Sequence, residues 1–134
     1  MNSDCIFCKI ISGDIPSYKV YEDENVIAFL DIFPIRPGHM LVVPKVHVDE
    51  FQNLDDTIYQ EVMMQVRNLA RKIKDVYKPA KVGIMVMGWD VPHAHIHVLP
   101  MEESGDITSR IYIEGAKTRA SYEDLEKTIE LFHT

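Results

Sequence analysis

Short apolar runs that are bounded by turn residues indicate β-strands, and the chain contains several of them. Charged or turn-forming residues such as Asp23–Asn25 separate neighbouring runs, so that consecutive strands are expected to pair antiparallel. The predicted strands are Val20–Glu22, Val26–Leu30, His39–Val43, Val82–Met87 and the last run, which lies within Val91–Pro100.

A different spacing, with an apolar residue every three or four positions, predicts a long helix that begins at Asp55–Asp56 and ends before Pro79. Acidic residues lie at its start and basic residues near its end, as the helix dipole favours. The apolar stripe consists of Ile58, Val62, Val66, Leu69, Ile73 and Val76.

The last third of the chain carries a weaker pattern. Ser121 with Asp124 three residues later resembles a capping box, and it predicts the start of a C-terminal helix. Residues 101–117 are polar and poorly patterned, apart from a possible short strand at Arg110–Ile113. Strands, a helix, strands and a second helix predict an α+β fold around an antiparallel sheet.

Composition narrows the class of protein. With 134 residues, of which 46% are hydrophobic and 26% charged, the chain is expected to form one domain over residues 1–134. Its net charge of −7 argues against nucleic acid and against anionic membrane surfaces as partners. No run approaches the roughly 20 apolar residues of a membrane span, and Met1–Asp4 lacks a basic signal start. A cytoplasmic location is therefore expected.

Three of the six histidines, His93, His95 and His97, are separated by single apolar residues. In an extended strand they would share one face, roughly 6–7 Å apart, while Ala94 and Ile96 would face the core. Three imidazoles bury less apolar area than Val or Ile would, so we interpret the pattern as functional rather than as a solvated strand face. Two chemistries fit: metal binding, or nucleophilic catalysis by one ring with charge stabilisation by its neighbours.

Both cysteines, Cys5 and Cys8, lie near the start of the chain with two residues between them. This spacing fits half of a structural zinc site or a redox dithiol. A thioredoxin-like motif should follow a buried strand, whereas only Met1–Asp4 precede Cys5. A zinc site would need two further ligands, which the histidines could supply.

The stretch from His93 to Leu99 resembles the H-φ-H-φ-H-φ-φ signature, φ being apolar, of the histidine-triad (HIT) nucleotide-binding hydrolases. Segments upstream, Cys5–Ile11, Ala28–Ile32 and Pro37–Lys45, are similar to the N-terminal half of the family in order and spacing. The resemblance extends from about Cys5 to Pro100. It implies a HIT-like fold, with a five-stranded antiparallel sheet, one long helix and one C-terminal helix, and usually a homodimer whose sheets join.

The resemblance also implies an activity: hydrolysis or transfer of a nucleoside monophosphate held through its α-phosphate, commonly from purine phosphoramidates, acyl nucleotides or dinucleoside polyphosphates. His95 matches the nucleophile that forms a covalent nucleotidyl intermediate, His97 a phosphate-contacting residue and His39 an accessory histidine. His97 stands where related transferases carry Gln, which favours hydrolysis. Asp31 matches the carboxylate that binds the ribose hydroxyls. The matching walls around the base are Phe7, Ile10, Ile15, Phe29 and Ile32.

Some bacterial-type members of this family carry a structural zinc ion, and this chain has residues at the matching positions. The implied tetrahedral ligands are Cys5, Cys8, His47 and His93. No catalytic cofactor is expected.

The link before the triad, Gly88–Val91, departs from the family pattern. Asp90 replaces a hydroxyl residue that commonly contacts the leaving group, and Trp89 replaces a Gln. We expect Trp89 to be a packed ring. Asp90 is either a general acid, kept protonated by the nearby phosphate and by partial burial beside Trp89, or a brace for the short turn. Leaving-group preference cannot be transferred from the family.

Two alternatives to a nucleotide hydrolase or phosphoramidase stay open on the sequence. One is a nucleotide-binding or sensory module whose catalysis is weakened by the altered loop. The other is a metalloenzyme in which the three histidines bind one catalytic metal ion.

Overall fold

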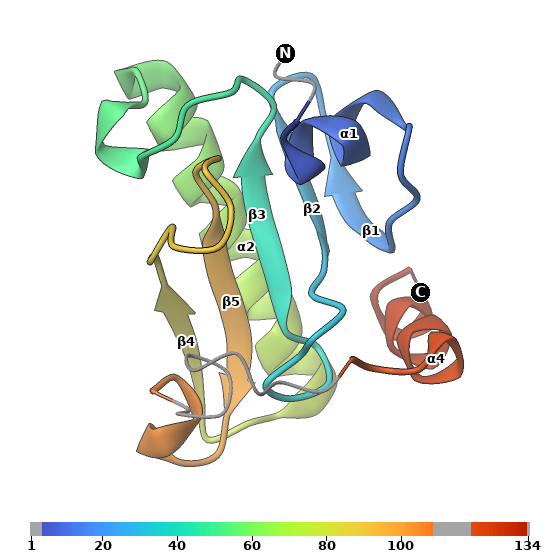
Figure 1. Ribbon diagram of the computed structural model, residues 1–134. Coiled ribbons are helices and arrows are strands. Elements are labelled where there is room, and N and C mark those ends of the chain that lie inside the picture. Colours follow the sequence, from blue (N-terminus) through green and yellow to red (C-terminus); the bar gives the residue numbers. More distant parts are fainter. Residues whose placement is uncertain (1–3, 109–118, 134) are drawn as a thin grey trace.

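The structure is a computed structural model that describes residues 4–108 and 119–133. Its strands are β1 (Lys19–Glu22), β2 (Val26–Leu30), β3 (Met40–Pro44), β4 (Lys81–Met85) and β5 (Ile96–Met101) (Figure 1). Its α-helices in this part of the chain are α1 (Ile6–Ser12), α2 (Asp56–Tyr77) and α4 (Tyr122–Phe132). Short 3-10 turns cover Phe51–Asn53 and Ser104–Asp106.

The five strands form one sheet in the order β1-β2-β3-β5-β4, and every neighbouring pair is antiparallel. The α+β class, the five-stranded antiparallel sheet, the long helix and the C-terminal helix are thereby confirmed. The possible strand at Arg110–Ile113 lies outside the described residues. In the part of the chain that the structure describes, no helix combines the length and the apolar character that crossing a bilayer requires.

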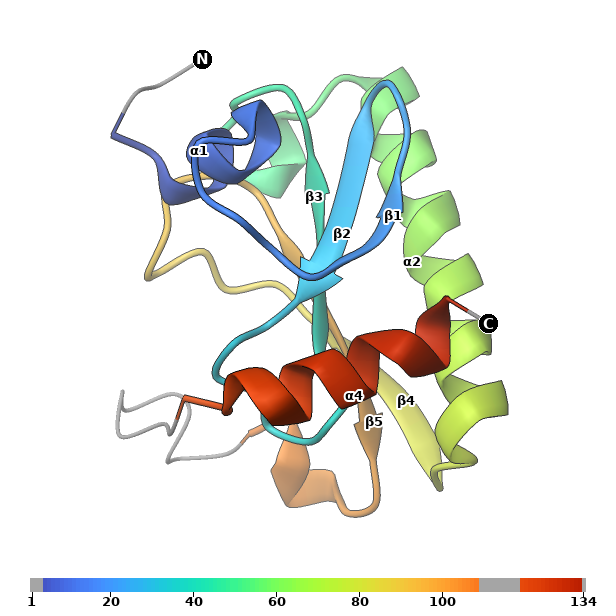
Figure 2. The same ribbon diagram turned by 90° about the vertical axis from the view of Figure 1, so that its right-hand side faces the viewer.

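The sheet separates two layers of apolar side chains. On one face, alternate residues of β2 and β3 pack against Val62, Val66, Leu69 and Ile73 of α2 and against α4. On the other face, the intervening residues, among them Phe29 and Leu41, pack against α1. Figure 2 shows α2 on one side of the sheet and α1 on the other. His97 pairs with Leu41, and Leu41 pairs with Phe29, so the His97 ring belongs to the α1 face.

The long helix begins and ends as its sequence indicates. The Asp55 side chain accepts a hydrogen bond from the Ile58 N–H, and the helix ends before Lys78 in the left-handed conformation. In α4 the Ser121 hydroxyl accepts from the Asp124 N–H, as the capping pattern predicts.

Several predicted boundaries were wrong. Helix α1 was not predicted, and β3 begins at Met40 and includes Pro44 instead of stopping before it. Strand β4 ends at Met85. The triad strand starts only at Ile96, and it continues through Pro100 to Met101. Among the described strands, β5 pairs only with β4 beyond Val98. Pro100 therefore has no ladder hydrogen bond to a described strand on its other side.

Gly38, which lies two residues before strand β3, packs closely against the end of α2. Its φ of +99° lies in the left-handed region, and a Cβ atom there would meet the Tyr77 Cε2 atom at 2.4 Å. The Tyr77 ring in turn packs against Phe132, with ring centroids 6.0 Å apart. Only glycine therefore brings the backbone that precedes His39 this close to α2.

Candidate active site

The three histidines of the triad do not share one face. The His93 N–H donates to the Val91 carbonyl at 2.8 Å, so the chain turns tightly before β5. The His93 ring is buried beside the two cysteines. The His95 and His97 rings lie together instead, with centroids 5.2 Å apart. The predicted common face was wrong because His93 and His95 precede the strand.

His95 is held as a neutral ring with a defined proton position. Its Nδ1 lies 2.7 Å from the His93 carbonyl oxygen. A carbonyl can only accept, so Nδ1 carries the proton and Nε2 keeps its lone pair. Burial lowers the pKa of His95, although the His93 carbonyl and the charges of Asp31 and Asp90 oppose this effect. Near neutral pH the ring therefore offers an unprotonated nitrogen.

A chain of hydrogen bonds gives His97 the opposite proton pattern. The Ile35 N–H donates to His39 Nδ1 at 3.0 Å, so the His39 proton must lie on Nε2. His39 Nε2 lies 2.9 Å from His97 Nδ1 and donates to it. The proton of a neutral His97 ring is then on Nε2. Asp31, with its Oδ2 atom 3.5 Å from His39 Nε2, stabilises this arrangement.

The two rings thus offer complementary groups, a lone pair on His95 and an N–H donor on His97. Asp31, His39 and His97 also lie close enough together to suggest a metal site. However, His39 Nε2 carries a proton and so cannot be a ligand. These contacts are better explained as hydrogen bonds.

His95 and His97 line a cavity of about 660 Å³ on the α1 face of the sheet. This volume lies within the range of small-molecule sites, about 300–1,000 Å³. Asp31 lies on its wall. All five predicted apolar wall residues line it as well: Phe7, Ile10, Ile15, Phe29 and Ile32.

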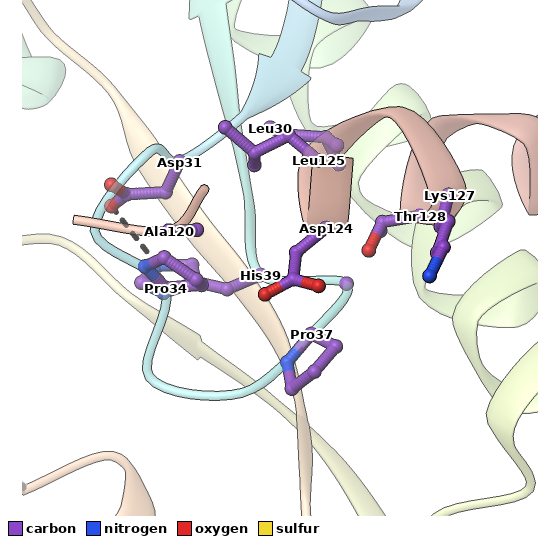
Figure 3. Close-up of a pocket in the computed structure, with 11 residues that line it drawn as sticks. Leu30, Asp31, Pro34, Pro37, His39, Ala120, Asp124, Leu125, Lys127 and Thr128 are labelled. Atoms are coloured by element: carbon purple, nitrogen blue, oxygen red, sulfur yellow. Dashed lines mark ion pairs between the residues drawn. The ribbon is translucent and has the colours of Figure 1, made fainter. Parts of the chain in front are cut away.

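His39 does not line this cavity. It is fully buried behind His97 and borders a smaller cavity of about 320 Å³ between the 34–38 loop and α4. Figure 3 shows the ion pair of Asp31 with His39 on one side of that cavity and Asp124 and Thr128 projecting from α4 on the other. His39 therefore acts on the main cavity through its contacts with His97 and Asp31, which both line it.

The loop after β4 differs from expectation. The Trp89 side chain is 87% exposed instead of packed, and Asp90 is exposed instead of partly buried beside it. Both residues still line the main cavity. Sequence reasoning missed other lining residues, notably Ser17, Arg119 and Tyr122, because they lie in segments without a chemical motif.

Cys5, Cys8, His47 and His93 form a separate cluster behind the cavity, and their ligand atoms all lie within 4.8 Å of one another. The His93 Nδ1 atom is 3.4 Å from Cys5 Sγ, 3.5 Å from Cys8 Sγ and 3.1 Å from His47 Nδ1. Cys8 Sγ lies 3.2 Å from His47 Nδ1. A tetrahedral zinc ion with ordinary bond lengths would separate sulfur and nitrogen ligands by about 3.6 Å and two nitrogens by about 3.3 Å.

Proton positions in the cluster also suit a metal ion. His93 Nε2 lies 2.8 Å from the Pro44 carbonyl oxygen, so it donates there and Nδ1 keeps the lone pair that faces the other ligands. Burial, with repulsion from His47, lowers the pKa of His93 and keeps the ring neutral. The four side chains thus fit a structural zinc ion, whose chemistry would be to cross-link α1 to the segments before β5 and after β3.

The family model described as HIT domain matches residues 12–104. The chain belongs to the histidine-triad (HIT) family. Protein hit of Bacillus subtilis is 43% identical to this HIT chain over 110 residues, covering 77% of this chain and 74% of the relative. The adenosine 5′-monophosphoramidase HNT1 of Saccharomyces cerevisiae is 36% identical over 108 residues, covering 78% and 68% of the two chains.

A solved HIT structure bears on the metal cluster. The zinc-bound histidine-triad protein from Mycobacterium smegmatis superposes with a TM-score of 0.69 at 29% identity. The match covers 96% of this HIT chain and 89% of that protein. Zinc binding thus occurs within the HIT family, in a protein of the same fold.

Proposed function

We propose that this chain hydrolyses nucleoside phosphoramidates, with a purine nucleoside as the preferred class, through a covalent nucleotidyl-histidine intermediate. The observation that carries the proposal is the opposite proton pattern of His95 and His97 at one cavity. A nucleophile and a fixed donor are the two groups that displacement at phosphorus needs. The phosphoramidase activity named for yeast HNT1 supports this choice of substrate.

In the first step His95 Nε2 attacks the α-phosphorus, a P–N bond to the ring forms, and the P–N bond to the leaving amine breaks. The leaving amine gains a proton. In the second step water attacks the same phosphorus and gives one proton to the base left when the amine was protonated. The bond to His95 breaks, and the nucleoside monophosphate leaves. The His97 N–H donates to a phosphate oxygen in both steps, where negative charge develops.

The remaining predicted residues receive roles by position. Asp31 binds the ribose hydroxyls, and the apolar walls hold the base. His39 is a positioning residue, since it does not line the cavity and contacts His97 and Asp31, which do. Asp90, exposed at the cavity, is the candidate acid for the leaving amine. Replacing Asp90 with Asn should slow substrates with poor leaving groups far more than those with good ones. Equal slowing of both would assign Asp90 to the scaffold.

We further propose that Cys5, Cys8, His47 and His93 bind a structural zinc ion. The proposed zinc site is connected to the proposed nucleophile through His93. The His93 ring would bind zinc, and the His93 carbonyl accepts a hydrogen bond from His95 Nδ1 and so orients that ring. Zinc-binding cysteines must stay reduced, and Cys5 and Cys8 form no disulfide, so we propose a reducing compartment, the cytoplasm. Zinc well below one ion per chain in reduced, chelator-free protein would refute the site.

A homodimer is the proposed assembly. Strand β4 lies at the end of the sheet, and two apolar residues, Ile84 in this strand and Val86 just after it, are 48% and 39% exposed. Pairing of two copies along β4 would join the sheets and cover this surface. Replacing Ile84 with Lys should yield a folded monomer in sedimentation. A variant that stays dimeric would place the interface elsewhere.

Geometry argues against the metalloenzyme alternative. The three triad histidines do not converge, since the His93 ring faces the cysteines while His95 and His97 face the cavity. The alternative of a nucleotide-binding module predicts nucleotide binding without turnover. A measurement of turnover therefore separates this alternative from the proposed hydrolase.

The deciding experiment is intact-mass analysis after brief incubation with adenosine phosphoramidate and a neutral quench. The wild type should show one nucleotidyl adduct and turn over. Replacing His95 with Ala should abolish adduct and turnover while nucleotide binding is retained, and replacing His97 with Ala should slow adduct formation without removing it. Turnover by the His95 variant would refute the nucleophile, and binding without turnover by the wild type would support the binding module.

A further inference from the structure

The smaller cavity, between the 34–38 loop and α4, has no part in the proposed reaction (Figure 3). Its volume is about 320 Å³, compared with about 660 Å³ for the main cavity. This volume is at the lower end of the range of small-molecule sites. A ligand that fits here is therefore smaller than one that fills the main cavity.

Apolar side chains form much of the wall of this cavity. They are Leu30, Pro34, Pro37, Ala120 and Leu125. Leu30 of β2 and Leu125 of α4 belong to one core cluster, and the Ala120 N–H donates to the Ile32 carbonyl at 2.8 Å. The start of α4 is thus tied to the end of β2. The cavity is therefore built between segments that hold each other in place, and it offers a carbon surface to a ligand.

The charged side chains that line this cavity are two carboxylates, Asp31 and Asp124, and one ammonium group, that of Lys127. The Lys127 Nζ atom lies 3.1 Å from Glu123 Oε1, so a carboxylate outside the cavity offsets its charge. Within the described part of the chain, the Asp124 carboxylate has no hydrogen-bond or ion-pair partner. His39, which is neutral, adds no charge. The cavity therefore favours a cation.

An aliphatic primary amine, protonated at neutral pH, combines the two properties that the wall requires. Its ammonium group donates hydrogen bonds to carboxylate and hydroxyl oxygens, and its carbon skeleton covers apolar side chains. Asp124 supplies a carboxylate, and Thr128, four residues further along α4, supplies a hydroxyl on the same side of the helix. Figure 3 shows both side chains projecting from α4.

We propose that the smaller cavity binds a small aliphatic ammonium ion, with its charge at Asp124 and its carbon skeleton against Leu30 and Leu125. Asp31 lines both cavities, and its Oδ2 atom lies 3.5 Å from His39 Nε2. A cation in the smaller cavity attracts the Asp31 carboxylate and weakens its contact with ribose, so amine and nucleotide lower each other's affinity. Amine binding is independent of the proposed reaction, whereas this coupling rests on the ribose role proposed for Asp31.

The test compares cyclohexylamine with cyclohexanol, which has the same ring and no charge, by NMR chemical-shift titration of the protein. The amine should bind about fivefold more tightly, the upper value for an exposed ion pair, and should shift the signals of Ala120 and Leu125. Asp124→Asn should bring this ratio close to one. Glu126→Gln, which removes the same charge from α4 outside the cavity, should leave the ratio nearly unchanged. Thr128→Leu, which fills the cavity, should weaken binding of both compounds.

Absence of amine binding, equal affinity for amine and alcohol, or a ratio that Asp124→Asn leaves in place would each overturn the site. Repeating the titration with adenosine monophosphate separates the two cavities. The apparent dissociation constant of the amine should rise about fivefold and then level off, because coupling between two sites saturates. A rise that continues in proportion to the nucleotide would place the amine in the main cavity and overturn the site, and no rise would refute the coupling through Asp31. None of these measurements needs turnover, so their failure is distinct from failure of the proposed hydrolysis.

Discussion

Replacing Gly38 with alanine should destabilise the fold and slow catalysis, because this glycine meets two separate requirements. Its φ of +99° is unfavourable for alanine, and the added Cβ would meet the Tyr77 ring at 2.4 Å. The left-handed conformation costs about 1–2 kcal/mol for a residue with a side chain. Displacing a packed ring costs about 1–3 kcal/mol more, so the loss should total about 2–5 kcal/mol.

The matched control is Gly13→Ala. Gly13 has a similar φ of +88°, yet nothing lies within 4 Å of its Cβ position. The free energy of unfolding of this variant should fall only by the cost of the left-handed conformation, about 1–2 kcal/mol. Gly38→Ala measured in a Tyr77→Ala background should fall to the same value, because the clash is gone.

Urea unfolding gives these stabilities, and kcat/KM of the folded variants reports the site. His39 follows Gly38 directly, so a displaced loop should move the His39 ring from His97 and lower turnover without abolishing it. If Gly38→Ala costs no more than Gly13→Ala, Tyr77 does not hold this backbone in place and the reasoning is wrong.

Two further predictions concern charge and metal. The Asp106 carboxylate accepts a hydrogen bond from Arg36 Nε at 2.7 Å. It also accepts from the backbone N–H groups of Glu102 and Glu103, at 2.8 and 3.1 Å. These bonds, above all the one from Arg36, lower the pKa of Asp106. Asp106→Asn should therefore lower the free energy of unfolding by about 1–3 kcal/mol at neutral pH. The difference in stability from the wild type should shrink as pH falls below the usual Asp pKa of about 3.9, because the wild-type carboxylate becomes protonated. A difference in urea unfolding that does not change with pH would contradict this assignment. Cys8→Ser should remove most bound zinc in elemental analysis, lower the thermal midpoint and reduce turnover together, whereas loss of zinc with unchanged turnover would show that the cluster does not orient His95.

The sequence predicted the elements whose apolar residues recur at a regular spacing. Val62, Val66, Leu69 and Ile73 recur at helical spacing because one face of α2 packs on the sheet, and the capping side chains mark both predicted helix starts. Helix α1 was missed because seven mostly apolar residues show no period and its N-cap is a cysteine. Its cap is the Cys5 thiol, which accepts from the Cys8 N–H.

The site was predictable as a set of residues but not as an arrangement. The family resemblance named His95 as a cavity residue and Cys5, Cys8, His47 and His93 as the proposed metal cluster, and the structure brings each group together. The assumption of an extended strand, however, placed His93 on the cavity face. The proton pattern of His97 depends on Ile35 and His39, which reach it only through the tertiary fold. Exposure of Trp89 follows from how its loop leaves β4, and no local pattern encodes that.

His93 has a consequence for how mutational data on this protein should be interpreted. Its imidazole is turned away from the cavity, while its carbonyl lies 2.7 Å from Nδ1 of His95, the proposed nucleophile. Substitution changes the imidazole and leaves the carbonyl in place. If His95 is the nucleophile, an alanine scan scored by activity alone would rank His93 beside it, although the proposed mechanism gives the His93 ring no chemical step. Restoring activity to a His93 variant by a second-site change that rigidifies the turn would reveal the difference.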